Sequence, residues 1–332
     1  MLRIGLLGCG RIGRVHAMTI AAAQGTRLVA VSDALPEAAH AVAETYDARV
    51  MPSEELITSD DVDAVAICAP TTTHFDLIHQ AAAAGKAIFC EKPIDLSTER
   101  TLACIEAVES AGVPFMTAFN RRFDPSFASL QKQVRDDVIG DVELVTILSR
   151  DPSPPPISYI EQSGGLFRDM MVHDFDMARF LLGEEPTRVF AFGSSVVDPA
   201  IGGAHDVDTA VVSLETASGK LCQISNSRRA TYGYDQRIEV HGSKGLIKGE
   251  NQLSHAVVLA NSEGFQSAPT EYFFLERYAR AYALEMEHFI QAVASGATPS
   301  PSIHDGLRAQ MLADAAQLSK DKQIPVSISH SS

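Results

Sequence analysis

Apolar and polar positions follow two alternating patterns over the first 120 residues. Short runs that are almost entirely apolar, as in strands covered on both faces, alternate with longer segments that are apolar at i, i+3 and i+4. The predicted strands are residues 2–7, 27–32, 63–69, 87–90 and 114–119. The predicted helices between them are residues 11–23, 36–46, 74–84 and 97–110. Strands that alternate with helices indicate a doubly wound parallel sheet of the Rossmann type, in the α/β class.

The pattern changes after about residue 120. A proline-rich segment, 151–156, precedes a helical stretch at 164–182, and two more helices are expected at 276–295 and 304–318. Between them, turn residues separate predicted strands at 188–196, 208–215, 220–227, 236–241 and 256–259. This spacing predicts a C-terminal α+β domain with a large, mainly antiparallel sheet. The two domains are expected at 1–120 and 121–332, with the last helix as a candidate to pack back on the first domain.

Composition narrows the class of protein. Of the 332 residues 45% are hydrophobic, which excludes a disordered chain despite a formal net charge of −15. That negative charge argues against nucleic acid or an anionic membrane as a partner. No apolar run reaches the roughly 18 residues of a membrane-spanning helix, and the N-terminus lacks the layout of a signal peptide. The five cysteines form no C-x-x-C motif and suit reduced core thiols, so a cytoplasmic protein is expected.

A G-x-G-x-x-G motif follows the first predicted strand and begins the first predicted helix. Gly8 permits a tight turn, Gly10 lets a pyrophosphate approach the backbone, and Gly13 allows close helix–strand packing. Asp33 lies 20 residues after Gly13 at the end of the second strand, where a carboxylate binds the adenosine ribose hydroxyls. The motif therefore predicts dinucleotide binding, with NAD favoured because Asp33 would repel the 2′-phosphate of NADP. The alternative for Asp33 is a helix cap before Pro36.

Two further strand ends are candidates for the same site, since ligands of open α/β sheets bind beyond the carboxyl ends of strands. One strand ends in a segment that includes Ala69, Pro70, Thr71 and His74. The next ends in Glu91-Lys92-Pro93, where Lys92 is placed to reach a substrate oxygen, the alternative being a surface salt bridge. The expected cofactor contacts are Gly8, Gly10, Arg11, Ile12, Gly13, Asp33, Ala69, Pro70, Thr71, His74, Glu91 and Lys92.

The predicted helix at 164–182 contains a second candidate group. Asp169 and His173 are four residues apart and so share one helix face, where the carboxylate raises the basicity of the imidazole and orients it as a general base. The alternatives are a core histidine or a metal site that also uses Asp174. No further ligand spacing completes such a set, so no metal is expected. Motifs for a catalytic serine, a catalytic cysteine or a Walker P-loop are absent from the sequence.

Taken in this order, the glycine motif, Glu91-Lys92-Pro93 and the Asp169–His173 helix resemble the Gfo/Idh/MocA oxidoreductase family over nearly the whole chain. Residues 164–182 (GGLFRDMMVHDFDMARFLL), 232–235, 277–282 and 301–306 are most similar to its inositol dehydrogenases. The resemblance implies NAD-dependent oxidation of a cyclic polyol, with myo-inositol, oxidised to 2-keto-myo-inositol, as the first candidate. The alternatives are another inositol isomer, a pyranose sugar, or a regulator that binds the dinucleotide without turnover.

The resemblance also implies roles for single residues. Lys92, Asp169 and His173 match the catalytic triad of the family, with His173 as general base and Lys92 as a hydrogen-bond donor to the reacting oxygen. The polyol contacts that it implies are Lys92, Arg121, Asp151, Asp169, His173, Tyr234 and Tyr282. Arg122 stays an alternative to its neighbour Arg121. A homotetramer formed through the C-terminal sheet is expected on the same ground.

Overall fold

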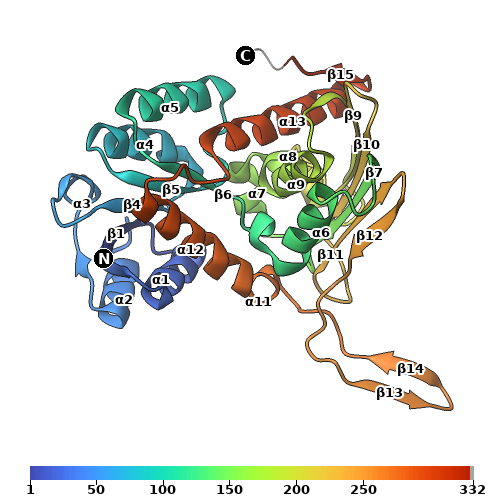
Figure 1. Ribbon diagram of the computed structural model, residues 1–332, viewed down its shortest axis with the longest axis horizontal. Helices are drawn as coiled ribbons and strands as arrows, with labels where there is room; N and C mark the ends of the chain where they lie inside the picture. Colours follow the sequence, from blue (N-terminus) through green and yellow to red (C-terminus); the bar gives the residue numbers. More distant parts are fainter. Residues whose placement is uncertain (330–332) are drawn as a thin grey trace. The chain divides into compact units, whose positions relative to one another are not determined.

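The computed structural model describes residues 1–329 and divides into two compact units (Figure 1). The first unit consists of Met1–Phe123 and Ala281–Gln310, and the second of Asp124–Arg280 and the chain from Met311 onward. The first unit is therefore discontinuous in sequence. The segment that returns to it contains most of the penultimate helix and the beginning of the last one, where the sequence suggested the last helix alone.

Six parallel strands form the sheet of the first unit, as the sequence predicts, in the order β3-β2-β1-β4-β5-β6. The strands are β1 (Leu2–Leu7), β2 (Thr26–Ser32), β3 (Arg49–Val50), β4 (Ala64–Ile67), β5 (Ala87–Glu91) and β6 (Phe115–Ala118). β3 was not predicted from the sequence, because its two residues are exposed and form no apolar run. The strand order reverses between β1 and β4, and ligands of open α/β sheets bind beyond the carboxyl ends of the strands at such a point.

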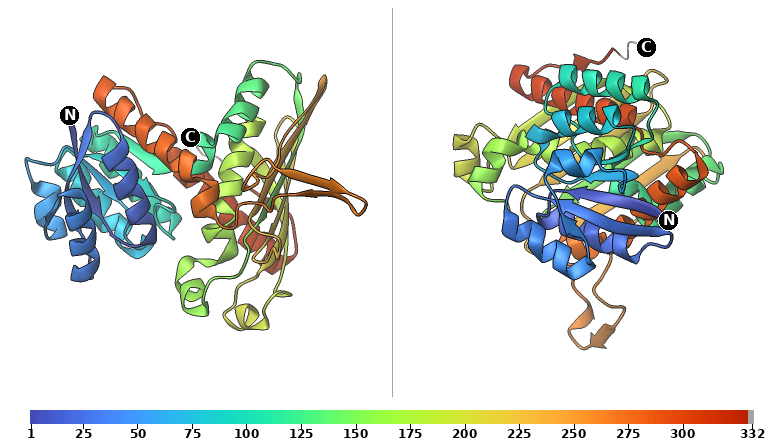
Figure 2. Two further views of the ribbon diagram at one scale, coloured as in Figure 1. Left: turned by 90° about the horizontal axis from the view of Figure 1, so that it is seen from below. Right: turned by 90° about the vertical axis from the view of Figure 1, so that its left-hand side faces the viewer.

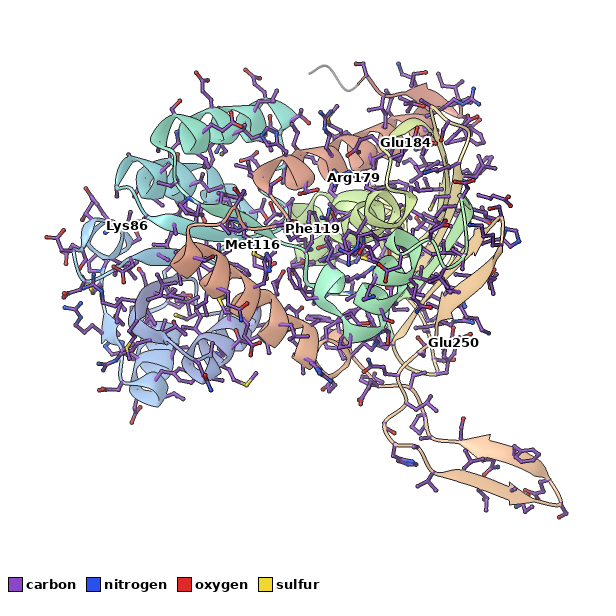
Figure 3. All side chains as sticks on the ribbon, in the orientation of Figure 1. Lys86, Met116, Phe119, Arg179, Glu184 and Glu250 are labelled. Atoms are coloured by element: carbon purple, nitrogen blue, oxygen red, sulfur yellow. The ribbon has the colours of Figure 1, made fainter. Side chains whose placement is uncertain are left out.

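Helices cover both faces of this sheet (Figure 1). They are α1 (Arg11–Ala22), α2 (Pro36–Tyr46), α3 (Ser53–Thr58), η1 (Thr71–Thr73), α4 (His74–Ala83), α5 (Thr98–Ala111), η2 (Asn120–Phe123) and α12 (Ala279–Ser295). The core joins Ile4 and Phe89 of the sheet to Met286 and Phe289 of α12. The rings of Phe89 and Phe289 meet edge to face, with their centroids 5.6 Å apart. Figure 3 labels Met116, a buried residue of β6 in the same core.

The second unit contains a seven-stranded sheet with the order β12-β11-β7-β10-β9-β8-β15. Its strands are β7 (Val142–Arg150), β8 (Pro186–Ser194), β9 (Thr209–Thr216), β10 (Leu221–Ser227), β11 (Asp235–Gly242), β12 (Gly245–Gly249) and β15 (Val326–Ser327). The sheet is mainly antiparallel, as predicted, but β7 and β10 pair in parallel. β7, which lies near the middle of the sheet, was missed by the sequence analysis although its residues are mostly apolar or β-branched.

The helices of the second unit lie on one side of its sheet, seen edge-on in the left view of Figure 2. They are α6 (Pro125–Arg135), α7 (Ile157–Ser163), α8 (Gly165–Asp169), α9 (Val172–Leu182), α10 (Pro199–Gly203), α11 (Phe274–Arg277) and the later part of α13 (Ile303–Lys322). Strand residues on the other face are exposed and include Leu144, Phe192, Val211, Leu221 and Leu246. This sheet is therefore packed on one face only. No helix within residues 1–329 is long and apolar enough to cross a membrane.

A hairpin arm projects from the second unit (Figure 1). β13 (Val258–Asn261) pairs only with β14 (Gly264–Ser267), and every residue of both strands is exposed. The prediction that residues 256–259 belong to the large sheet was therefore wrong, because a short apolar run does not reveal which partner strand it pairs with. Glu250, labelled in Figure 3, precedes the arm.

Candidate functional site

The three glycines of the turn between β1 and α1 differ in how much space surrounds them. Gly8 has a φ of +100°, and a Cβ atom there would lie 2.6 Å from the backbone of Cys68 and Ala69. A methyl group on Gly13 would overlap the carbonyl oxygen of Gly8. Gly10, by contrast, has no neighbour within 4 Å of such a group. Gly8 and Gly13 thus have the steric roles that the motif predicts, and Gly10 faces open space.

The beginning of α1 suits an anion. Gly10 precedes the helix without a side-chain cap, and the first turn contains no acidic residue. The N–H groups at this end form the positive pole of the helix, which favours a phosphate. Arg11 is exposed at the first helical position, and Ile12 is half-buried against the core. The turn therefore fits the pyrophosphate of a dinucleotide both sterically and electrostatically.

Asp33, directly after β2, forms hydrogen bonds in two directions. Its Oδ2 accepts a hydrogen bond of 2.6 Å from the N–H of Cys9, inside the glycine turn. Its Oδ1 accepts one of 2.8 Å from the N–H of Leu35, which precedes α2. Asp33 is thus not a helix cap, because α2 begins after Leu35 without a side-chain cap, but it connects the residue before α2 to the glycine turn. A carboxylate accepts about four hydrogen bonds, so these two leave capacity for ribose hydroxyls.

His74, after β4, bridges two loops. Its ring is 1% exposed, with Nδ1 2.9 Å from the carbonyl oxygen of Pro93 and Nε2 2.9 Å from that of Ala69. The buried side chain thus connects the loop after β4 to the loop after β5. This structural role differs from the direct cofactor contact that the sequence suggested. Pro70 is exposed and Thr71 half-buried, so this loop, unlike the histidine, presents groups to the surface.

The end of β5 is held by a histidine that the sequence analysis did not single out. Glu91 is buried, and its Oε1 lies 2.7 Å from Nε2 of His16, which is fully buried in α1. The other carboxylate oxygen, Oε2, accepts a hydrogen bond of 3.2 Å from the N–H of Lys92. Lys92 itself is half-buried. The sequence offers one indication that His16 is buried near this site: it follows Gly13 by three residues and so lies on the same face of the predicted helix.

Asp169 and His173 lie at a junction between two helices. α8 ends at Asp169 and α9 begins at Val172, whereas the sequence predicted one helix over 164–182. Met170 and Met171 in between keep helical torsion angles, with φ of −97° and −73°, so the chain continues in a similar direction. No glycine or proline marks this break, which explains why the sequence did not reveal it.

Asp169 contacts a tyrosine and a buried arginine. Its Oδ1 accepts a hydrogen bond of 2.9 Å from the hydroxyl of Tyr159 in α7. Its Oδ2 lies 3.6 Å from Nη1 of Arg228, a side chain that is 1% exposed. Nη2 of the same guanidinium lies 3.6 Å from Asp206 Oδ2. Tyr159 lies ten residues before Asp169 in another helix, and Arg228 and Asp206 are distant in sequence. They were missed because they form no local motif with Asp169.

Asp174 is directed into the second unit rather than toward a shared site with Asp169. It is fully buried, and its two oxygens accept hydrogen bonds from Nδ2 of Asn226 (3.0 Å) and Nε2 of Gln236 (3.3 Å). These amides come from β10 and β11. Within residues 1–329, no group of three or more His, Cys, Asp or Glu side chains has a geometry that could hold a metal ion.

The two arginines that the sequence left as alternatives differ in their surroundings. Both belong to η2, and Arg121 is 3% exposed. Nη2 of Arg122 lies 2.9 Å from Asp305 Oδ1, an ion pair with a carboxylate at the beginning of α13. Arg122 is thus anchored within the first unit. Tyr282, also of this unit, is buried with its ring 5.7 Å from that of His16.

The remaining predicted polyol contacts lie in the second unit. Asp151 follows β7, is half-buried, and donates its backbone N–H to the carbonyl oxygen of Ser227 (3.0 Å). Tyr234 precedes β11 and is buried, with its ring edge to face with that of Tyr278 at 5.8 Å. Both residues therefore lie at the same end of the sheet, where β7 ends and β11 begins.

The five cysteines are buried and form no disulfide with one another, which confirms their predicted place in the core. Burial raises the pKa of the Cys9 thiol to about 11 and that of Cys104 to about 12. The nucleophilic thiolate is therefore disfavoured at both positions. Neither thiol has the lowered pKa that nucleophilic catalysis requires.

Comparison with known proteins agrees with this geometry. Residues 2–119 match the oxidoreductase family profile described as an NAD-binding Rossmann fold, and residues 131–328 match that of its C-terminal alpha/beta domain. The chain is 54% identical to the inositol 2-dehydrogenase of Rhizobium meliloti (strain 1021), covering 98% of this chain and 99% of the relative. It is 45% identical to the myo-inositol 2-dehydrogenase of Thermotoga maritima, covering 98% of each.

A solved structure extends the similarity to a complex with ligands. The myo-inositol dehydrogenase of Lactobacillus casei, determined with NAD(H) and myo-inositol, superposes with a TM-score of 0.90 at 25% identity, covering 100% of this chain and 98% of that chain. The resemblance seen in the sequence and the prediction of an NAD-binding fold are thereby confirmed. The chain belongs to the Gfo/Idh/MocA family of oxidoreductases, with an NAD-binding Rossmann unit and the C-terminal alpha/beta domain of that family.

Proposed function

We propose that this protein is an NAD-dependent inositol 2-dehydrogenase that oxidises myo-inositol to 2-keto-myo-inositol. The observation that supports this most strongly is its similarity, over nearly the full length of both chains, to enzymes named for that activity. The open glycine turn and Asp33 support NAD as the cofactor, because a carboxylate at this position disfavours the 2′-phosphate of NADP.

The cofactor is proposed to bind along the carboxyl ends of β1, β2, β4 and β5. The backbone from Gly10 to Gly13 binds the pyrophosphate at the beginning of α1, and Asp33 binds the adenosine ribose. The loop of Ala69, Pro70 and Thr71 and the segment after β5 complete this set. When bound, NAD⁺ supplies the hydride acceptor at C4 of its nicotinamide ring.

The proton chemistry is assigned to three side chains of this protein. His173 removes the proton of the reacting hydroxyl as the hydrogen on the same carbon leaves with its electron pair. Asp169 orients the imidazole and stabilises the imidazolium that forms, and is itself held by Tyr159 and Arg228. Lys92 donates a hydrogen bond to the same oxygen and stabilises its developing negative charge.

The other ring hydroxyls are proposed to contact Arg121, Asp151, Tyr234 and Tyr282. Arg121 is proposed as the substrate residue of the two because the family resemblance matches it with a substrate contact, and Arg122 forms an ion pair with Asp305. Arg121→Lys tests this choice, since a lysine keeps the charge but loses the planar fork of donors. The expected result is a raised KM for the polyol without a change in the melting temperature.

A homotetramer formed through the C-terminal sheet and a cytoplasmic location are also proposed. The uncovered sheet face, with Phe192 and Leu221 exposed, supports burial against another copy of the chain. The buried free thiols support a reducing compartment. Light scattering on the purified protein tests the assembly, and Phe192→Asp with Leu221→Asp should dissociate it. A monomeric unsubstituted protein would contradict the tetramer.

The experiment that tests the function is a substrate panel. Purified protein is mixed with NAD⁺ or NADP⁺ and with myo-inositol, scyllo-inositol, D-chiro-inositol, glucose or xylose, and NADH formation is followed by its absorbance. The expected result is turnover of myo-inositol with a preference for NAD⁺, abolished in His173→Ala. Activity confined to another polyol would contradict the substrate, and NAD binding without any turnover would contradict the enzyme and favour a regulator.

A further inference from the structure

Two buried histidines hold the chain on either side of Lys92. His16 lies in α1 and contacts Glu91, the residue before Lys92, and His74 lies in α4 and contacts Pro93, the residue after it. We infer that His16 and His74 are positioning residues for Lys92, one acting through the Glu91 carboxylate and the other through the Pro93 carbonyl. This inference rests on the role proposed above for Lys92.

The contact on the first side is a hydrogen bond between buried groups. Nε2 of His16 lies 2.7 Å from Oε1 of Glu91, and the N–H of Lys92 donates to Oε2 at 3.2 Å. The Glu91 side chain is thus in contact with His16 through one oxygen and with the Lys92 backbone through the other. The His16 ring packs edge to face against Phe89 (4.9 Å) and Tyr282 (5.7 Å), which restricts its rotation. The carboxylate, and through it the Lys92 backbone, is thereby fixed.

The contact on the second side ties the Lys92 segment to the neighbouring loop. The His74 ring bridges the carbonyl oxygens of Pro93 and Ala69, each 2.9 Å from one ring nitrogen. His74 is the first residue of α4 and is nearly fully buried, so packing around the ring restricts its rotation. The loop after β5 therefore cannot shift without disturbing the loop after β4.

Fixing the backbone of Lys92 restricts the positions that its flexible side chain can reach. A lysine has a four-carbon stem with several rotatable bonds, so the position of its ammonium group depends on where its backbone is anchored. Misplacing a reacting group by about 1 Å is enough to cost on the order of 10²-fold in rate. Because α1 and α4 begin at the loops proposed to bind NAD, the two histidines also join Lys92 rigidly to those loops.

The bridging geometry of His74 allows a test with two substitutions of similar size. His74→Asn places an amide nitrogen near the position of Nδ1 and can keep the contact to Pro93, whereas His74→Gln reaches the position of Nε2 and can keep only the contact to Ala69. We expect kcat to fall about 10-fold in His74→Gln and much less in His74→Asn, with the Kd for NADH and the KM for the polyol unchanged in both. Equal losses of kcat in the two variants would overturn the role of His74.

His16 is tested in the same way. His16→Gln keeps a donor for Glu91 and should retain turnover, whereas His16→Leu removes the donor and should lower kcat about 10-fold or more. His79→Gln is the matched control, because His79 also lies in α4 and its ring packs on that of Phe75, with the centroids 4.3 Å apart. Its kcat should be unchanged. Thermal unfolding of each variant checks that the fold is retained.

A double-mutant cycle separates positioning from a general structural effect. In a Lys92→Ala background, His16→Leu and His74→Gln should cause no further loss of kcat, because the group that they position is absent. Losses that add fully to that of Lys92→Ala would overturn the inference. Full kcat in Lys92→Ala alone would refute the proposed role of Lys92 itself. A normal loss in Lys92→Ala with unchanged kcat in the histidine variants would refute the positioning role alone.

Discussion

The two units use their sheets differently. In the first unit the sheet is entirely parallel and covered by helices on both faces, and the proposed cofactor contacts come from the loops that follow its strands. In the second unit the sheet is mixed and covered on one face, and Asp169 and His173 project from helices on that face. The proposed cofactor contacts depend mainly on backbone geometry, whereas the proposed roles of Asp169 and His173 depend on the chemistry of their side chains.

This difference indicates a division of tasks within one chain. A pyrophosphate can be bound by main-chain N–H groups and a glycine turn, which any sequence with the right glycines provides. A polyol has hydroxyls in a particular arrangement, so side chains from several elements must converge on it. Substitutions in the glycine turn and at Asp33 should therefore change cofactor affinity, and substitutions at Asp169 and His173 should change turnover. Lys92 lies in the first unit but is proposed to contact the polyol, so its substitution should also change turnover.

The largest expected effect is on turnover. His173→Asn removes the proposed general base, and kcat should fall on the order of 10²- to 10⁴-fold. The Kd for NADH, measured by fluorescence titration, should be unchanged because the first unit holds the cofactor. Asp33→Ala should show the opposite pattern, with a raised Kd. If His173→Asn weakened NADH binding as strongly as it lowered kcat, the division of tasks would be wrong.

The next effect is on the stability of the second unit. Arg228 is nearly fully buried beside Asp169 and Asp206, so Arg228→Met removes the cation next to two carboxylates. Removing one partner of a buried ion pair costs about 3–5 kcal/mol in the free energy of unfolding, measurable by urea titration. Arg229→Met, at the exposed neighbouring position, is the matched control and should cost little. Equal losses at the two positions would show that burial of the ion pair contributes nothing.

A smaller effect distinguishes two glycines of the same motif. Gly13→Ala forces a methyl group onto the Gly8 carbonyl and should lower the free energy of unfolding by about 1–3 kcal/mol. Gly10→Ala places its methyl group in open space, so stability should be unchanged while the affinity for NAD falls. Thermal unfolding and NADH titration of both variants measure the contrast. Unchanged affinity in Gly10→Ala would contradict the proposed path of the pyrophosphate.

The smallest expected effect is a pH dependence of stability in the first unit. Burial lowers the pKa of His74 and of His288 below the ordinary value of 6.5. Between the folded and unfolded pKa values, the unfolded chain binds more protons than the folded one. Stability should therefore decrease as the pH falls below about 6.5. His74→Gln should reduce this slope, since it removes one of the two imidazoles. A slope of the opposite sign would show that burial of these imidazoles does not control it.

The first unit was largely predictable from the sequence because its signals are local. The apolar runs predicted β1 with both of its ends correct, and the helix expected at 36–46 is α2. Buried parallel strands are nearly continuous apolar runs, and helices between them have a different period. Gly8 and Gly13 could also be identified, because the motif defines their places within six residues of sequence.

The second unit was less predictable because its contacts are distant in sequence. Nothing near Asp169 indicates that Tyr159 and Arg228 contact it, and the break at Met170–Met171 lacks a glycine or proline. The arm was mistaken for part of the sheet, since pairing depends on which partner the strand meets. His16 and His74 are an exception within the first unit, because buried histidines do not reveal from sequence what they contact.

The discontinuity of the first unit has a consequence for its synthesis. Phe89 and the sheet around it reach the ribosome exit long before Met286 and Phe289, which complete their core. A nascent chain that ends near residue 123 therefore exposes the side of the sheet that α12 later covers, and the nucleotide-binding half can finish folding only after the other half has been translated. A fragment that ends at residue 119, where the match to the NAD-binding profile ends, would also lack α12. A chimera that exchanges the first unit between two members of this family therefore needs a junction on each side of the second unit's main segment, as well as one near residue 310.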